Sequence, residues 1–270
     1  MSFVLELLII FSISISINML FFIFAYLIQK DLFTDITYAS TFSITLIASM
    51  LLGNGFGINS IVALVLVGAW SIRLGTFLFI RILKEKVDHR FDKMRNNFYK
   101  FFVFWIIQAV TVFVVSLPSY FVVLLGDNQF NLLSLIGVVG AILALTFETV
   151  ADIQKFTFLQ KNKGKFIQHG LWKISRHPNY FGEYTFWAFN FIFVVLSTSN
   201  HLVWISIIGP LFIALMIYKI SGLPMLEKGM WKTFKENPKY IEYVNKTPRV
   251  VPLIGIKGMK RGWIDENTNR

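Results

Sequence analysis

The chain has 270 residues, of which 55% are hydrophobic and 17% aromatic, yet its formal net charge is +11. Its mean hydropathy of +0.62 and its charged fraction of 15% exclude an ordinary soluble domain, in which about 25% of residues are charged. Disorder, collagen and coiled coil are excluded by the same figures, and the absence of cysteine excludes a disulfide framework or a cysteine-ligated metal. The apolar background favours a membrane over nucleic acid as the partner of the basic residues, and no metal site is expected.

Seven apolar runs are candidates for membrane-spanning helices, because crossing the hydrocarbon core takes roughly 20 apolar residues. They lie near residues 3–28, 38–53, 59–83, 101–125, 132–151, 184–199 and 201–219. The second and sixth runs are short, and Asn200 is the clearest break between the sixth and the seventh. The predicted fold class is all-α, a polytopic membrane bundle of about seven helices that forms one integral-membrane domain over residues 1–270.

Lysine and arginine collect in three segments, as they do in the cytoplasmic loops of membrane proteins. Residues 84–100, 155–176 and 219–270 together hold 23 of the 26 basic residues. Alternation of basic and non-basic loops predicts an N-terminus outside and a C-terminus in the cytoplasm, in a bacterial inner membrane. Residues 152–183 then form a cytoplasmic loop and turn, and residues 220–270 form a cytoplasmic helix and tail.

Two groups of charged residues lie where burial in the membrane makes them costly. Arg73 falls near the middle of the third run, where it either binds an acidic group of a ligand or pairs with Glu148 or Asp152. Glu148, Asp152 and Lys155 stand at i, i+4 and i+7, which places them on one helical stripe. A polar stripe that descends from the cytoplasmic surface suits a hydrophilic ligand entering from that side.

The most specific string in the chain is GLWKISRHPNYFGEY at residues 170–184. Its proline disfavours helix at His177 and suits the first turn of a new helix, on which Asn179 and Glu183 share a face. A helix N-terminus flanked by Arg176 and His177 favours an anion, which makes a ligand site the preferred interpretation. The alternative is a capped helix start that the arginine anchors at the membrane surface.

The basic tail follows a Gly-Leu-Pro sequence that ends the seventh run and begins another helix. Glu227 and Trp231 share a face of that helix, and Tyr240 and Tyr243 lie at i and i+3 beyond it. The tail is either an interfacial helix lying on anionic lipid or a lid over the cytoplasmic mouth of the bundle, and the two roles are compatible.

The strings SRHPNYFGE, FETVADIQK and SGLPMLEK resemble the steroid 5-alpha-reductase-like superfamily, most closely a bacterial branch described as a domain of unknown function. The similarity runs from about Asp35 to Pro252. It implies a seven-span membrane oxidoreductase that binds NADPH from the cytoplasmic side and reduces a carbon–carbon double bond in a steroid-like or lipid acceptor. The cofactor-binding residues that we expect are Glu148, Asp152, Lys155, Arg176, His177, Asn179, Tyr180, Glu183, Glu227, Trp231, Tyr240 and Tyr243.

The chain departs from the steroid reductases at the position that polarises the substrate. Those enzymes place a tyrosine three residues before the third-span arginine, and it works with a second-span glutamate on the enone oxygen. Here Trp70 occupies that position, and the nearest carboxylate is Asp35, followed by Tyr38. Tryptophan is no proton donor in this role, so we expect an acceptor other than a steroid. The catalytic candidates are Asp35, Tyr38, Trp70 and Arg73.

Two other functions remain open from the sequence. One is an S-adenosylmethionine-dependent membrane methyltransferase of the isoprenylcysteine carboxyl methyltransferase type, which shares an RHP-x-Y-x-G turn. Asn179 and Glu183, together with Glu148 and Asp152, favour the reductase over it. The other is a non-catalytic lipid-binding membrane protein that keeps the fold without the chemistry.

Overall fold

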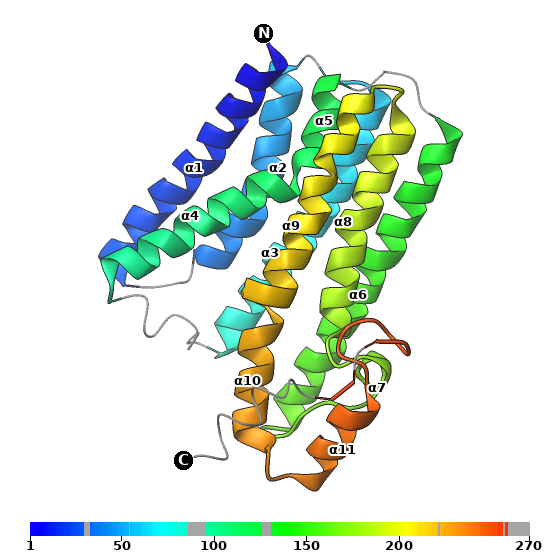
Figure 1. Ribbon diagram of the computed structural model, residues 1–270. Helices are drawn as coiled ribbons and strands as arrows, with labels where there is room; N and C mark the ends of the chain where they lie inside the picture. Colours follow the sequence, from blue (N-terminus) through cyan, green and yellow to red (C-terminus); the bar gives the residue numbers. More distant parts are fainter. Residues whose placement is uncertain are drawn as a thin grey trace. The chain divides into compact units, whose positions relative to one another are not determined.

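A computed structural model describes residues 1–29, 33–53, 55–85, 96–125, 131–220, 222–255 and 257–258 (Figure 1). Across these ranges the chain is helical and contains no strand, which confirms the all-α fold class. Within the described ranges, six helical segments are long and apolar enough to cross a membrane, so the chain is a multi-pass membrane protein. They are Phe3–Ile28, Thr34–Leu52, Ile58–Lys84, Phe98–Val115, Leu132–Lys161 and His201–Phe234.

The first four predicted runs form five helices. The first three become α1 (Phe3–Ile28), α2 (Thr34–Leu52) and α3 (Ile58–Glu85). The fourth run divides into α4 (Phe98–Val115) and α5 (Leu117–Leu125), because Pro118 has no N–H with which to continue the ladder of α4. The basic residues Lys86, Arg90, Lys93 and Arg95, which the topology prediction placed in a cytoplasmic loop, lie outside the described residues.

The fifth and sixth runs differ most from their predicted bounds. A short 3₁₀ turn at Leu132–Ser134 leads into α6 (Leu135–Lys161), which extends ten residues beyond the predicted end. After α7 (Leu171–Ile174), helix α8 (Pro178–Ser197) begins at its proline, six residues early. It is not one of the six helices apolar enough to cross a membrane, because its first turns are polar.

The rest of the described chain is a broken helix followed by two shorter ones. The seventh run forms a 3₁₀ helix at His201–Ile207, α9 (Ile208–Leu215) and a π-helical turn at Met216–Ile220. Helices α10 (Leu223–Phe234) and α11 (Pro238–Lys246) come next, and both carry proline in their first turn. Residues 259–270, the end of the predicted tail, lie outside the described residues.

The chain forms two compact units, Met1–Val139 with Trp187–Phe212, and Gly140–Phe186 with Ile213–Arg270. In the first unit, α1 packs against α2 and α4, and α2 packs against α3. Its centre is aromatic, with the rings of Phe42, Trp70 and Trp187 lying 4.9 to 5.2 Å apart. A buried polar contact joins α1 and α4, where Gln108 Nε2 donates to Asn18 Oδ1 at 2.9 Å.

The second unit contains all of the expected cofactor-binding residues, whereas the four catalytic candidates belong to the first. In this second unit the indole N–H of Trp172 donates to the Ala151 carbonyl at 2.9 Å, which holds α7 on α6. Phe166, Phe234 and Tyr240 form an aromatic cluster with ring centroids 5.1 to 5.5 Å apart. These contacts join α7 to α6, and α10 to α11, at the end of the second unit where α8 begins (Figure 1).

Candidate functional site

Three charged side chains from distant parts of the second unit meet in its interior. Glu227 of α10 lies between Arg176, which precedes α8, and Arg249, which follows α11. Glu227 Oε1 is 3.2 Å from Arg176 Nη1, and Glu227 Oε2 is 2.8 Å from Arg249 Nε. Side-chain exposures are 3% for Glu227, 3% for Arg176 and 13% for Arg249. One carboxylate therefore faces two buried guanidinium groups, which leaves this charged cluster with a net positive charge.

The backbone around Arg176 fixes the charged cluster in place. Ser175 is extended, with φ −149° and ψ 146°, and it ends α7. The polar groups of this extended segment form hydrogen bonds with the tail that follows α11. Ser175 Oγ donates to the Val250 carbonyl at 2.7 Å, and the Arg176 N–H donates to the Pro248 carbonyl at 2.8 Å. Arg176 Nη2 donates to the Gly258 carbonyl at 2.9 Å. The tail after α11 is thus bonded directly to the turn that the sequence identified.

His177 adds a neutral group to the charged cluster. Its Nε2 lies 3.3 Å from Glu227 Oε1, and its ring stacks on Tyr180 at 5.9 Å. Burial lowers the pKa of His177 to about 4, although the neighbouring Glu227 acts in the opposite direction. The imidazole is therefore neutral at pH 7. With its proton assigned to Nε2, facing Glu227, Nδ1 is a hydrogen-bond acceptor.

Two buried acceptors in this turn have no hydrogen-bond partner within the described part of the chain. They are His177 Nδ1 and Asn179 Oδ1, at the start of α8. Most buried polar atoms in proteins are paired, and each exception calls for an explanation. Because both atoms accept, the complementary group is one that donates, such as an amide N–H, an amino group or a hydroxyl.

The stripe predicted on α6 is present, and it lies toward the rest of the second unit. Glu148 is 3% exposed and Asp152 8% exposed, and Lys155 Nζ lies 4.9 Å above the ring of Trp172. Gly182 of α8 packs directly on Glu148, since a Cβ at Gly182 would lie 2.6 Å from the Glu148 Cβ. The absent side chain at Gly182 therefore allows α8 to approach the acidic face of α6.

The tyrosines of α11 act in packing and in one hydrogen bond. Tyr243 OH donates to the Trp172 carbonyl at 2.6 Å, and Tyr240 is buried in the aromatic cluster. Burial raises the pKa of Tyr240 to about 12, and it raises the pKa of Tyr243 as well, so both stay protonated. Trp231 on α10 and Glu183 on α8 are half-buried.

Two catalytic candidates of the first unit are engaged in charge interactions. Asp35 Oδ2 lies 3.1 Å from Arg81 Nη2, with both side chains 24% exposed. Arg73 lies 5.9 Å from the ring centroid of Phe77, within the range of a cation–π interaction. The expected pairing of Arg73 with Glu148 or Asp152 concerns residues of the other unit and stays a prediction.

The other two catalytic candidates belong to the aromatic centre of the first unit. The rings of Tyr38 and Phe42 meet edge to face at 5.2 Å. Trp70 is fully buried and packs on Phe42 and on Trp187. In this setting Trp70 fills the core of the helical bundle.

Two arginines that the sequence did not single out form ion pairs with candidate residues in the structure. Arg249 completes the charged cluster, and its signal was a short Pro-Arg-Val-Val-Pro stretch, in which flanking prolines favour an ordered extended chain. Arg81 pairs with Asp35, but near the end of a membrane helix it looks like an ordinary anchoring residue.

Comparison with known proteins identifies the family. The profile of the family described as protein of unknown function (DUF1295) matches residues 21–247, so the chain belongs to that family. The matched region contains every candidate residue from Asp35 to Tyr243 and ends just before Arg249. Comparisons with curated proteins and with solved structures gave no match.

Proposed function

For this member of the DUF1295 family, we propose a membrane-embedded, NADPH-dependent reductase that acts on a carbon–carbon double bond of a hydrophobic acceptor, a steroid-like molecule or a lipid. The observation that carries the proposal is the pair of buried acceptors, His177 Nδ1 and Asn179 Oδ1, beside the buried arginines of the charged cluster. The reaction class comes from the resemblance to the steroid 5-alpha-reductase-like superfamily. We place the protein in a bacterial inner membrane, with the candidate site toward the cytoplasm.

The residues of the second unit fit the chemical groups of a dinucleotide. NADPH carries a carboxamide, an amino group and ribose hydroxyls, which are the donors that His177 and Asn179 lack. Its phosphates suit Arg176 and Arg249, because guanidinium groups bind phosphate oxygens in a bidentate manner and remain charged when buried. Glu227 holds the two guanidinium groups in place. When bound, NADPH supplies the hydride.

His177 has a binding role in this proposal, because its protonation state does not suit acid catalysis. Reduction of a double bond consumes one hydride and one proton. With a pKa of about 4, His177 is unprotonated at neutral pH and has no proton on Nδ1 to give. His177 instead orients the cofactor through that nitrogen.

A second candidate is the S-adenosylmethionine-dependent methyltransferase, and the position of Trp70 favours it. Trp70 stands where the steroid reductases carry their proton-donating tyrosine, and it is fully buried among aromatic rings. A methyl transfer needs no such donor. S-adenosylmethionine also carries amino and hydroxyl groups that match the two buried acceptors.

A thermal-shift titration of the purified full-length protein separates the candidates. We expect NADPH to raise the unfolding temperature in a saturable way and S-adenosylmethionine to leave it unchanged. Stabilisation by S-adenosylmethionine alone would overturn the reductase in favour of the methyltransferase. If neither nucleotide stabilises the protein, the non-catalytic lipid-binding alternative replaces both.

A further inference from the structure

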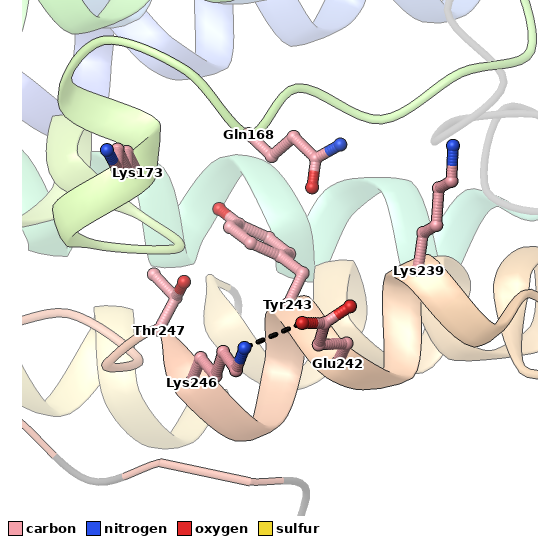
Figure 2. Close-up of a pocket in the computed structure, with 7 residues that line it drawn as sticks. All are labelled: Gln168, Lys173, Lys239, Glu242, Tyr243, Lys246 and Thr247. Carbon is pink, nitrogen blue, oxygen red and sulfur yellow. Dashed lines mark hydrogen bonds and ion pairs between the residues drawn. The ribbon is translucent and has the colours of Figure 1, made fainter.

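A second, exposed site lies along α11. It is a surface pocket of about 480 Å³ whose lining includes three lysines, Lys173, Lys239 and Lys246, together with Gln168 and Glu242 (Figure 2). Its size falls in the range of about 300–1,000 Å³ that is typical of small-molecule sites. None of these five residues belongs to the charged cluster of Arg176, Glu227 and Arg249.

The pocket has two walls from separate parts of the second unit. On α11, Lys239, Glu242 and Lys246 occupy one stripe, since they stand at i, i+3 and i+7. The segment that carries Gln168 and Lys173 runs along the opposite side (Figure 2). The two walls are joined by Tyr243, which also lines the pocket and whose OH donates to the Trp172 carbonyl at 2.6 Å.

The charges of this pocket do not balance. Lys246 Nζ is 2.6 Å from Glu242 Oε1, so that lysine is neutralised by its neighbour. The structure shows no ion pair for Lys173 or Lys239 within the described ranges, and no hydrogen bond for the side chain of Gln168. Two ammonium groups and one amide therefore remain available around a concave surface, with a net charge of about two positive units.

We infer that this pocket binds a phosphate group, separately from the proposed cofactor site. Two ammonium groups and an amide supply several N–H donors around one space, and phosphate is the common biological anion with enough oxygens and charge to use them. The phosphate belongs either to a soluble phosphorylated molecule or to the headgroup of an anionic lipid. Both sources present the same group to Lys173 and Lys239.

The test measures phosphate binding by the full-length protein in two forms. Calorimetric titration with inorganic pyrophosphate measures the soluble source. Native mass spectrometry of the detergent-purified protein with phosphatidic acid, against phosphatidylcholine, measures the lipid source. Saturable binding in either arm that the pocket variants below weaken supports the site and identifies its source, and binding in neither arm overturns it.

Three variants assign the binding to this pocket. The double variant Lys173→Gln/Lys239→Gln should weaken binding by about tenfold or more, because it removes both unneutralised charges. Glu242→Gln should tighten binding severalfold, because it removes the negative charge and releases Lys246. An increase in affinity is not a consequence of misfolding.

The matched control is Lys232→Gln/Lys235→Gln, which makes the same charge change on exposed residues of the α10 segment. It should leave the dissociation constant within about twofold of that of the unmodified protein. The inference is overturned if the control weakens binding as much as the pocket variant does, or if Glu242→Gln fails to tighten it. Neither result bears on the binding of NADPH.

Discussion

Glu227 Oε1 lies 3.2 Å from Arg176 Nη1, and both side chains are only 3% exposed. This contact joins α10 to the turn before α8 in the interior of the second unit. Removing two charges from water costs several kcal/mol for each, and close pairing recovers that cost only where further partners are present. Arg249 supplies such a partner on the second carboxylate oxygen. The stability of the second unit therefore depends on Glu227 remaining ionised.

Glu227→Gln should destabilise the protein by about 3–5 kcal/mol, because it leaves two buried guanidinium groups without their shared carboxylate. The measurement is unfolding of the purified protein in detergent, followed by circular dichroism. The matched control is Glu242→Gln, whose partner Lys246 is 75% exposed. It should leave the free energy of unfolding nearly unchanged, because solvent screens an exposed ion pair. If the two variants lose the same amount of unfolding free energy, the buried contact contributes no more to stability than the exposed one.

Stability should fall as the pH is lowered from 6.5 toward 4. The pKa of His177 is lowered to about 4 in the folded protein, mainly by burial, from 6.5 in the unfolded chain. The unfolded chain therefore binds more protons across this window, and acid favours unfolding. The difference corresponds to roughly 3 kcal/mol.

The His177→Gln variant isolates this contribution, because glutamine keeps a donor for Glu227 and does not titrate. The pH dependence of its unfolding free energy should be shallower than that of the unmodified protein between pH 4 and pH 6.5. Above pH 6.5 the two curves should run parallel. Curves that are parallel throughout the range would contradict the assignment of a buried neutral imidazole.

Two glycine substitutions should change stability in opposite directions. Gly182→Ala would place a Cβ 2.6 Å from the Glu148 Cβ and 2.8 Å from its Cα, so α8 must move away from α6. The expected cost is about 1–3 kcal/mol. Gly229→Ala on α10 meets nothing within 4 Å and should stabilise the helix by about 0.5–1 kcal/mol. Thermal unfolding of both variants checks the packing, and a stabilised Gly182→Ala protein would refute it.

Apolar run length predicted where most helices lie, because burial in lipid imposes a minimum number of apolar residues. Local breaks were harder to place. The fourth run divides at Ser116, since one proline changes the hydrogen bonding of an otherwise uniform stretch. Helix α6 extends beyond the apolar run to Lys161, and the first polar turn of this extension contacts α7, where Gln154 Oε1 accepts from the Leu171 N–H at 2.9 Å.

The residues of the candidate site that lie in the string at residues 170–184 could be predicted from the sequence, but the contacts they make with distant residues could not. Arg176 and His177 meet Glu227 as neighbours, although 50 residues separate His177 from Glu227 in the chain. Arg249 was missed because no periodic pattern marks a residue in a tail of bends and turns. Its place depends on hydrogen bonds from Ser175 and Arg176 to that tail, which are long-range contacts with no local signature.

The central claim is that the start of α8 binds NADPH through Asn179, and a direct titration tests it. Fluorescence of NADPH is followed as the purified protein is added, for the unmodified chain, for Asn179→Ala and for the exposed control Asn245→Ala. We predict that NADPH binds saturably to the unmodified chain. Asn179→Ala should weaken the binding by about tenfold, which corresponds to the loss of one to two buried hydrogen bonds. Asn245→Ala should leave the affinity unchanged. Absence of saturable binding, or equal affinity in all three proteins, would contradict the account.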